Sequence, residues 1–412
     1  MQIGVQMKRV GIIGGGASGM TAAIAAAEQG ARVTILEAND RVGKKILATG
    51  NGKCNLGNER LGLEEYNTGE PAFLESCLRR FDTDETVNFF RRLGLLVKSK
   101  GGYLYPVSEQ ASAVLDVLRF ELKALSVEIV TECPAEEIAK EKGTGRIEVR
   151  AGGKRFWFDS LVLACGGRAA PKTGSDGSGY RLAGQIGHSV IPTVPALVQL
   201  KCREDFFRSV SGVRAEAELA LMCGERCVGR ERGELQFTDY GISGIPVFQL
   251  SRHVNYLLLE GKEPELVIDF LPDFSQTDWD RLYIGRLLLQ EQRTVEEFFT
   301  GLLNKKLMAL FIRQAGLKPT EEVKAADGDK IKKVFGLCRH FVLHADGDKG
   351  YENAQVCAGG VPLSELTENL ESKKTPGIFF AGELLDVDGK CGGYNLQWAW
   401  CSGFLAGSAA AR

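Results

Sequence analysis

Three glycines and one acidic residue near the start of the chain have the spacing of a phosphate-binding turn. Residues 9–37 read RVGIIGGGASGMTAAIAAAEQGARVTILE, with Gly14, Gly16 and Gly19 in a GxGxxG pattern and Glu37 at the end. The first glycine permits a tight turn, the second lets a pyrophosphate approach the backbone, and the third lets a helix pack closely on a strand. An acid in the position of Glu37 accepts hydrogen bonds from a ribose diol, so this stretch predicts a dinucleotide site.

The residues around these four predict the elements that position them. An apolar run at 9–13 enters the glycines, an alanine-rich segment follows to Gln29, and a β-branched run at 32–36 ends on Glu37. This is the strand–helix–strand order of a nucleotide-binding unit, in which the N-terminus of the helix holds the phosphates. A GxGxxG alone occurs by chance in a chain with 50 glycines. The prediction therefore depends on the complete unit, and a glycine-rich turn in an ordinary α/β protein is the alternative.

A second strand-to-helix motif stands near the end of the chain. Residues 378–407 read IFFAGELLDVDGKCGGYNLQWAWCSGFLAG, in which an apolar strand ends on Gly382 and Glu383 and two glycines precede a helix that begins near Asn395. A carboxylate at a strand end can hold ribityl hydroxyls, and a helix N-terminus can stabilise the negative charge of a reduced flavin. FAD is long enough to need one cradle for each half, so the two motifs together predict FAD. An ordinary C-terminal strand and helix with solvent-exposed acids is the alternative.

The pattern along the chain predicts an α/β protein with one discontinuous domain and one insertion. Residues 1–190 and 339–412 have the glycine-rich α/β character of a Rossmann-like domain, within which residues 71–93 predict one amphipathic helix. Residues 191–338 differ, because they are β-rich to about residue 272 and helical from about residue 276. We therefore expect an FAD-binding domain of residues 1–190 and 339–412 around an inserted domain of residues 191–338.

Composition argues against several classes of partner. The formal net charge is −2 with both signs interspersed, which gives no broad electrostatic reason to expect nucleic acid or a membrane surface. No apolar run approaches the ~20 residues that span a bilayer. The eleven cysteines are scattered without a CxxC pair, which favours free thiols in a reducing cytosol over a metal site. We expect a cytoplasmic protein that acts on a small molecule and holds no metal.

Six segments carry a family pattern in order over nearly the whole chain. They are IIGGGASGMTAA at the start, ATGNGKCNLGN at 48–58, GGRAAPKTGSDGSGYRLAGQIGHSVIPTVPALVQL at 166–200, GELQFTDYGISGIPVFQLS at 233–251, AQVCAGGVPLSEL at 354–366 and FFAGELLDVDGKCGGYNLQWAWCSG at 379–403. With them the chain resembles the HI0933-like flavoproteins, a branch of the two-dinucleotide-binding-domain flavoproteins. The resemblance implies an FAD domain with an inserted β-barrel plus helical domain. Cys165 and Cys357 depart from the pattern, since small or hydroxyl residues are commoner there.

The resemblance also implies which residues hold each part of FAD. The adenosine diphosphate half would contact Gly14, Gly16, Ser18, Gly19, Glu37, Lys44 or Lys45, Ala135, Ala164, Cys165 and Gly166. Of these, Glu37 would hold the ribose, a lysine would lie near the phosphates and Ala135 would touch the adenine through its backbone. The flavin half would contact the loop 49–55 with Gly50, Asn51, Gly52 and Asn55, the ribityl-binding pair Gly382 and Glu383, and Gly392, Gly393, Asn395, Leu396 and Gln397.

FAD predicts the type of reaction better than the substrate. It carries the redox chemistry, so we expect hydride transfer through the flavin N5 atom. No second GxGxxG follows a strand, so either NAD(P)H reduces the flavin directly as a transient reductant or another carrier does so. The family includes reductases of steroid enones, namely unsaturated 3-oxo bile acids, which implies a small unsaturated or carbonyl substrate. An RNA-modifying flavoprotein, which the near-neutral charge disfavours, and a non-catalytic electron-transfer flavoprotein are the alternatives.

The catalytic acid is not identified by the sequence. Reduction of an enone needs a proton donor opposite the hydride. Tyr240, Lys53, Tyr394 and His188 are candidates, and each has a structural role as the alternative. For Cys54, beside the proposed flavin loop, we expect a packing role rather than redox chemistry, because no resolving cysteine stands near it in the sequence.

Overall fold

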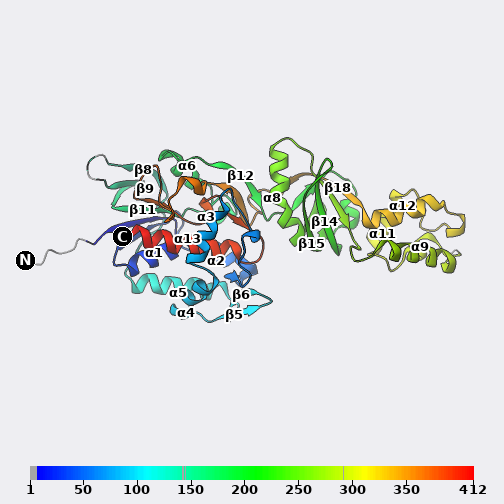
Figure 1. Ribbon diagram of the computed structural model, residues 1–412, viewed down its shortest axis with the longest axis horizontal. Coiled ribbons are helices and arrows are strands. Elements are labelled where there is room, and N and C mark those ends of the chain that lie inside the picture. Colours follow the sequence, from blue (N-terminus) through cyan, green and yellow to red (C-terminus); the bar gives the residue numbers. More distant parts are fainter. Residues whose placement is uncertain (1–6, 142, 144, 291) are drawn as a thin grey trace, which may run out of the picture. The chain divides into compact units, whose positions relative to one another are not determined.

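The computed structural model describes residues 7–141, 143, 145–290 and 292–412, shown in Figure 1. They form two compact units. The first unit holds the residues up to 194 together with 355–412, and the second holds residues 195–354. Within the described residues, no helix has both the length and the apolar character needed to cross a bilayer.

A five-stranded sheet forms the centre of the first unit. Its strand order is β20 (Ile378–Phe380), β11 (Ser160–Leu163), β1 (Arg9–Ile13), β2 (Arg32–Leu36) and β7 (Glu128–Val130). All neighbouring pairs are parallel, so the five carboxyl ends meet at one edge of the sheet. Strands β1, β2, β11 and β20 are largely buried and mostly apolar, as is usual for parallel sheets with covered faces, whereas the edge strand β7 is more exposed. The two ends of the chain therefore contribute to one sheet, as the paired motifs predict.

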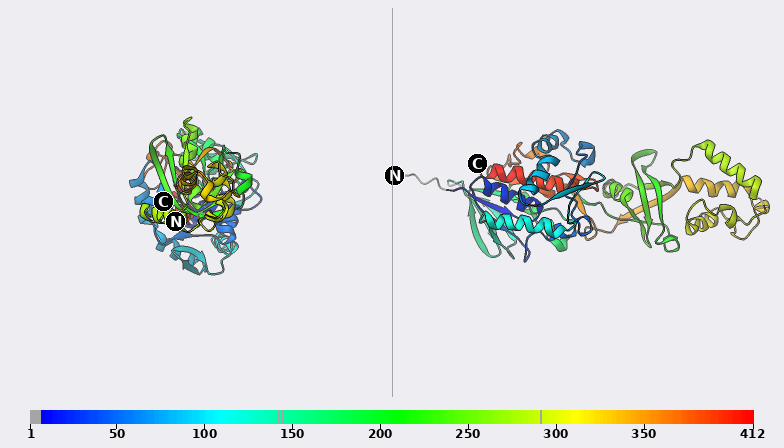
Figure 2. Two further views of the ribbon diagram at one scale, coloured as in Figure 1. Left: turned by 90° about the vertical axis from the view of Figure 1, so that its right-hand side faces the viewer. Right: turned by 90° about the horizontal axis from the view of Figure 1, so that it is seen from below.

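Two helices from opposite ends of the chain pack against each other beside this sheet. They are α1 (Ala17–Glu28) and α13 (Tyr394–Ala410), coloured blue and red in Figures 1 and 2. Glycines permit the close contact. A Cβ on Gly403 would lie 2.4 Å from the carbonyl oxygen of Ser18, and a Cβ on Gly407 would lie 2.1 Å from that of Ala22.

Smaller elements surround the sheet in the first unit. Four small sheets are β3 (Gly57–Asn58), β6 (Tyr103–Pro106) and β5 (Val97–Lys100); β10 (Lys154–Phe158), β9 (Ile147–Ala151) and β8 (Ala135–Lys140); β21 (Asp388–Gly389) and β4 (Tyr66–Asn67); β12 (Ile191–Ala196) and β19 (Val356–Gly360). The other α-helices are α2 (Lys44–Ala48), α3 (Pro71–Arg80), α4 (Thr83–Arg92), α5 (Ala111–Ala124) and α6 (Ser178–Gln185). The β10 residue Phe158 packs on Gly11 of β1, where a Cβ would lie 2.5 Å from the phenyl ring.

The single helix predicted over 71–93 is two helices. The chain leaves the helical conformation at Phe81, whose φ of −149° is extended. Asp82 then caps α4, because its carboxylate accepts a hydrogen bond from the backbone N–H of Glu85 at 3.0 Å. An aspartate that offers the backbone this bond favours a helix start over a helix interior.

The second unit contains a closed six-stranded barrel and a group of helices. The barrel order is β13 (Leu200–Cys202), β16 (Gly241–Gly244), β15 (Arg226–Phe237), β14 (Arg214–Cys223), β17 (Glu265–Asp269) and β18 (Phe341–Asp348). The helices are α7 (Phe207–Val210), α8 (Ile245–Leu259), α9 (Gln276–Gln290), α10 (Val295–Phe299), α11 (Lys305–Gln314) and α12 (Gly328–Arg339). Buried aromatic rings fill the core, with Phe270 packed against Phe237, Phe311 and Phe341.

The chain returns from the second unit to the first at a later residue than the sequence predicts. Strand β18 pairs with β13 and β17 and so closes the barrel, although its residues were expected in the FAD-binding domain. The first unit resumes at Gln355 rather than at residue 339. The first crossing falls after Val194, close to the expected residue 190. A barrel needs its last strand to pair with its first, and that pairing of distant segments has no local signature in the sequence.

The contact between α1 and α13 can be tested at Gly407. We expect Gly407→Ala to lower the free energy of unfolding by about 3 kcal/mol, because the new methyl group cannot avoid the backbone of α1. Gly184 on α6 is the control, since a Cβ there would meet no atom within 4 Å. Gly184→Ala should raise the stability by up to about 1 kcal/mol. Urea denaturation followed by circular dichroism measures both, and equal stability of Gly407→Ala and wild type would refute the close packing.

Candidate functional site

A cavity of about 330 Å³ opens at the carboxyl edge of the five-stranded sheet, within the first unit. Residues within three positions of the ends of four of the strands line it, as is usual for ligand sites of open parallel sheets. They are Gly14 after β1, Glu37 after β2, Ala164 after β11 and Glu383 after β20.

The turn after β1 has the geometry of an anion site. Gly14 has a φ of +99°, and a Cβ there would lie 2.5 Å from the carbonyl oxygen of Ala164. A Cβ on Gly16 would meet nothing within 4 Å, so this glycine borders open space at the cavity. Helix α1 has no side-chain cap and no acid in its first turn. Its first N–H groups therefore stay available to a phosphate.

Glu37 is a buried carboxylate held in a fixed orientation. Its side chain is 7% exposed, and Oε2 accepts a hydrogen bond from the N–H of Gly15 at 2.7 Å. Oε1 accepts from the backbone N–H of Asn39 at 2.8 Å and from its amide Nδ2 at 2.7 Å. Each carboxylate oxygen can accept two bonds, so Oε2 keeps capacity for a ribose hydroxyl.

Glu383 is the corresponding carboxylate at the other half of the cavity. Its Oε2 lies 2.7 Å from the Nζ of Lys45, and its Oε1 accepts from the N–H of Cys357 at 2.8 Å. Burial raises the pKa of the Cys357 thiol to about 12, so the thiol stays protonated and unreactive. The lining thus holds the buried acid Glu37, the partly buried acid Glu383 and the uncapped N-terminus of α1, and this set of donors and acceptors fits FAD.

The start of α13 offers its backbone rather than its side chains. The amide of Asn395 binds the backbone of Gly389, with Oδ1 accepting at 2.8 Å and Nδ2 donating at 2.7 Å. Gln397 is fully buried, and its Nε2 donates to the carbonyl oxygen of Asp82 at 3.0 Å. Both side chains are thus engaged in holding loops. The helix has no side-chain cap and no acid in its first turn, so its N–H groups are the donors available to a flavin edge.

The cavity brings together more than half of the residues expected to bind FAD. The lining contains Gly14, Gly16, Ser18, Glu37, Lys44, Lys45, Ala135, Ala164, Cys165, Gly166, Glu383, Asn395 and Leu396. Of the described residues, the lining does not include Gly19, Gly50, Asn51, Gly52, Asn55, Gly382, Gly392, Gly393 and Gln397. Gly19 permits close packing of α1 on the turn, because a Cβ there would lie 1.9 Å from the carbonyl oxygen of Gly14, and a Cβ on Gly382 would lie 2.4 Å from the hydroxyl of Ser18. Contact of the residues of either group with a cofactor stays a prediction.

Other lining residues were not anticipated from the sequence. They include Asn39, Arg41, Arg181, Gln355, Val356 and Trp398. Asn39 and Arg41 follow Glu37 within four positions, so the motif itself could have indicated them. Gln355 and Val356 reach the cavity only because the chain returns from the second unit at this point.

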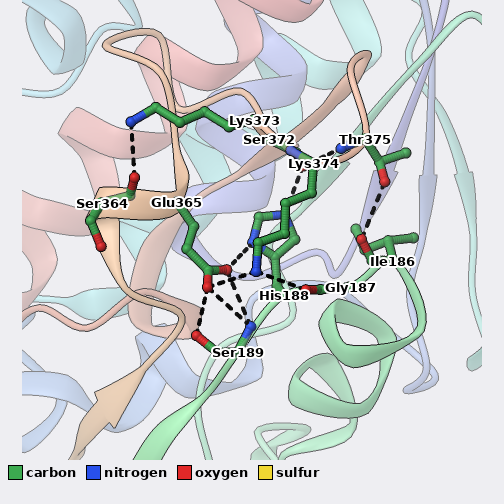
Figure 3. Close-up of polar contacts among 10 residues, drawn as sticks. All are labelled: Ile186, Gly187, His188, Ser189, Ser364, Glu365, Ser372, Lys373, Lys374 and Thr375. Carbon is green, nitrogen blue, oxygen red and sulfur yellow. Dashed lines mark hydrogen bonds and ion pairs between the residues drawn. The ribbon is translucent and has the colours of Figure 1, made fainter.

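His188, a candidate proton donor, lies in a buried polar network (Figure 3). Its Nδ1 is 2.7 Å from Glu365 Oε2, and its Nε2 is 2.7 Å from Ser372 Oγ. The order serine–histidine–glutamate is that of a hydrolytic triad, but Ser372 is only 2% exposed. Its hydroxyl also accepts N–H bonds from Lys374 at 3.1 Å and Thr375 at 2.8 Å. The network therefore joins two loops and does not expose a nucleophile.

The other three candidates, Tyr394, Lys53 and Tyr240, are likewise not among the residues that line the cavity. Burial raises the pKa of Tyr394 to about 12, and Lys53 pairs with Glu109 at 2.8 Å on the surface. Tyr240 belongs to the second unit, where the Nζ of Lys349 lies 4.3 Å from its ring centre. For Cys54, burial raises the pKa of the thiol to about 11, which favours a packing role.

The comparison with known proteins agrees with the site. Residues 8–409 match the family model described as the HI0933-like protein Rossmann domain. The chain belongs to this family. A 3-dehydro-bile acid delta(4,6)-reductase of Clostridium scindens is 46% identical, over 98% of this chain and 100% of the relative. A ribosomal RNA dihydrouridine synthase of Haemophilus influenzae is 28% identical, over 97% of this chain and 98% of the relative.

One solved structure illustrates the level of structural likeness. The 3-ketosteroid delta1-dehydrogenase of Sterolibacterium denitrificans aligns over 99% of this chain and 100% of its own, with a TM-score of 0.49 and 15% identity. A TM-score and a sequence identity this low carry no information about activity.

The network around His188 makes the stability of the first unit depend on pH. Burial lowers the pKa of His188 below its ordinary value of 6.5, although the hydrogen bond to Glu365 acts in the opposite direction. The unfolded chain therefore binds a proton that the folded chain resists, and the free energy of unfolding falls as the pH drops below 6.5. His188→Gln cannot titrate at this position, so the variant should lose less stability than wild type over this pH range, and the substitution should cost about 2 kcal/mol at pH 7.5.

Urea denaturation of both proteins from pH 7.5 to 5.5 measures the effect. Burial lowers the pKa of His253 to about 4, which acts in the same sense, but His253 is present in both proteins and cancels in the difference. Parallel profiles for wild type and His188→Gln would show that His188 does not titrate on unfolding.

Proposed function

We propose that this FAD-dependent oxidoreductase reduces a carbon–carbon double bond conjugated to a ketone, in a bile acid or a similarly apolar enone, with NAD(P)H as the donor. The observation that carries the proposal is the 46% identity to the bile-acid delta(4,6)-reductase, which extends over 98% of this chain. Full-length alignment means that both units, and not only the FAD domain, have counterparts in that enzyme.

The chain's own residues would bind the cofactor and hold it in place for this reaction. FAD supplies the hydride when bound, and the protein supplies orientation and electrostatics. The N–H groups at the start of α1 hold the diphosphate, Glu37 the ribose and Glu383 the ribityl chain. The uncapped start of α13 stabilises negative charge at the pyrimidine edge, because donors that are already oriented need no rearrangement when charge develops.

The proposal predicts a two-stage absorbance change in the flavin. Under anaerobic conditions NADH or NADPH should bleach the visible flavin band of the purified protein. A 3-oxo-4-ene bile acid should then restore the band, and the matched saturated 3-oxo bile acid should not, because it offers no double bond to reduce. Protein that takes up no FAD, or a reduced flavin that both compounds leave unchanged, would overturn the proposal.

A ribosomal RNA uridine is the second candidate substrate. The relative from Haemophilus influenzae is named a ribosomal RNA dihydrouridine synthase and aligns over 97% of this chain. Dihydrouridine is uridine with its ring double bond reduced, and that bond is also conjugated to a carbonyl group, so the same flavin chemistry would serve. We place it second because the identity is 28% rather than 46% and because a net charge of −2 offers RNA little attraction.

The two substrates can be separated on one preparation of reduced protein. We expect the enone to reoxidise the flavin at least tenfold faster than ribosomal RNA that lacks dihydrouridine, with little effect of salt on the enone reaction. Faster reoxidation by RNA, with a rate that falls steeply as salt rises, would favour the second candidate instead.

A further inference from the structure

We propose that the adjacent lysines of α2 serve the two halves of the FAD site separately. Lys45 positions Glu383 for the ribityl chain, and Lys44 braces Glu37 at the ribose through Asn39. The inference depends on the FAD site of the proposed function. It assigns to neither lysine the phosphate contact that the family resemblance implies, and makes both positioning residues.

The contact between Lys45 and Glu383 is short and partly shielded from water. Nζ and Oε2 are 2.7 Å apart, with side-chain exposures of 27% and 19%, and both residues line the cavity. The other oxygen of Glu383 accepts from the N–H of Cys357 at 2.8 Å. A Cβ on Gly167 would lie 2.9 Å from that oxygen, so the glycine permits this position of the carboxylate. Lys45 and Cys357 together fix which way the carboxylate faces.

Lys44 is bound at the opposite half of the site. Its Nζ lies 2.6 Å from Asp40 Oδ1 and donates to Asn39 Oδ1 at 3.3 Å. The same amide donates through Nδ2 to Glu37 Oε1 at 2.7 Å. Lys44, Asn39 and Glu37 therefore form a continuous chain of polar contacts that ends on the ribose-binding acid.

The geometry of the short helix α2 lets its two adjacent lysines reach different halves of the site. Consecutive side chains of an α-helix diverge by about 100°, so neighbouring lysines reach different partners. The ammonium group of each already contacts a carboxylate, at 2.6 Å for Lys44 and 2.7 Å for Lys45. The diphosphate is left to the uncapped N-terminus of α1. A single turn of α2 then sets the spacing between the two acids that grip the two polyol parts of FAD.

The test compares two ligands that differ by the flavin half. Calorimetric titration of the apoprotein measures its affinity for FAD and for ADP, which fills only the adenosine diphosphate part. We expect Lys45→Gln to weaken FAD binding about tenfold and to leave ADP binding within about twofold of wild type, as fits the loss of a charged hydrogen bond at the ribityl end. Lys44→Gln, the matched control one residue away, should weaken both ligands by the same factor.

Further variants separate positioning from a general effect on folding. Glu383→Gln should show the same selective loss of FAD affinity, and Lys45→Gln with Glu383→Gln should lose no more than either alone, because the two act as one unit. Lys45→Arg keeps the charge and should restore FAD binding. The thermal melting of each apoprotein should match that of wild type within the scatter of repeat measurements. If Lys45→Gln does not fold, the Glu383→Gln comparison decides the question.

The result that overturns the inference is equal weakening of FAD and ADP by Lys45→Gln, which would place Lys45 on the phosphates. Additive losses in the double variant would likewise overturn it. Wild-type apoprotein that binds ADP but not FAD would instead overturn the proposed function, so the two failures can be told apart.

Discussion

Contact between backbone atoms of α1 and α13 is the constraint on which the rest of the first unit depends. Gly403 and Gly407 let α13 lie against the carbonyl groups of Ser18 and Ala22, where any side chain would collide. The two helices follow β1 and β20 of one parallel sheet, so their N-termini face the same edge. Close packing therefore fixes the separation of two sets of free N–H groups, and a ligand that spans them needs a matching length.

Several residues that line the cavity could be predicted from the sequence, because they stand at or near the ends of strands. Gly14, Gly16, Glu37 and Glu383 all line the cavity, and each belongs to a short motif with a known physical requirement. The helix predicted over 71–93 was wrong because one capping aspartate, Asp82, outweighed an apolar period that continues across it. Capping is worth about 1 kcal/mol, enough to decide where a helix of ten residues begins.

Contacts between distant segments could not be predicted in the same way. Strand β18 closes the barrel from a position some 140 residues after β13, and Lys45 meets Glu383 from 338 residues away. Neither residue type nor spacing encodes such a partner. For Asn395 and Gln397 the motif predicts the place in the sequence but not the hydrogen-bond partners of the side chains, since both amides bind backbone carbonyl groups. Buried amide groups require hydrogen-bond partners, and here the backbone of neighbouring loops provides them.

Helices that start away from the cavity differ in their capping, since α3, α5 and α8 have no side-chain cap. Asp82 caps α4, Thr294 and Glu297 form a capping box on α10, and Asp327 caps α12. The starts of α1 and α13 carry neither a side-chain cap nor an acid, although both are at the cavity. A cap there would stabilise the helix by neutralising the groups that an anion needs. Leaving them uncapped keeps the backbone N–H groups of both helix starts available, as the proposed binding of the diphosphate and the flavin edge requires.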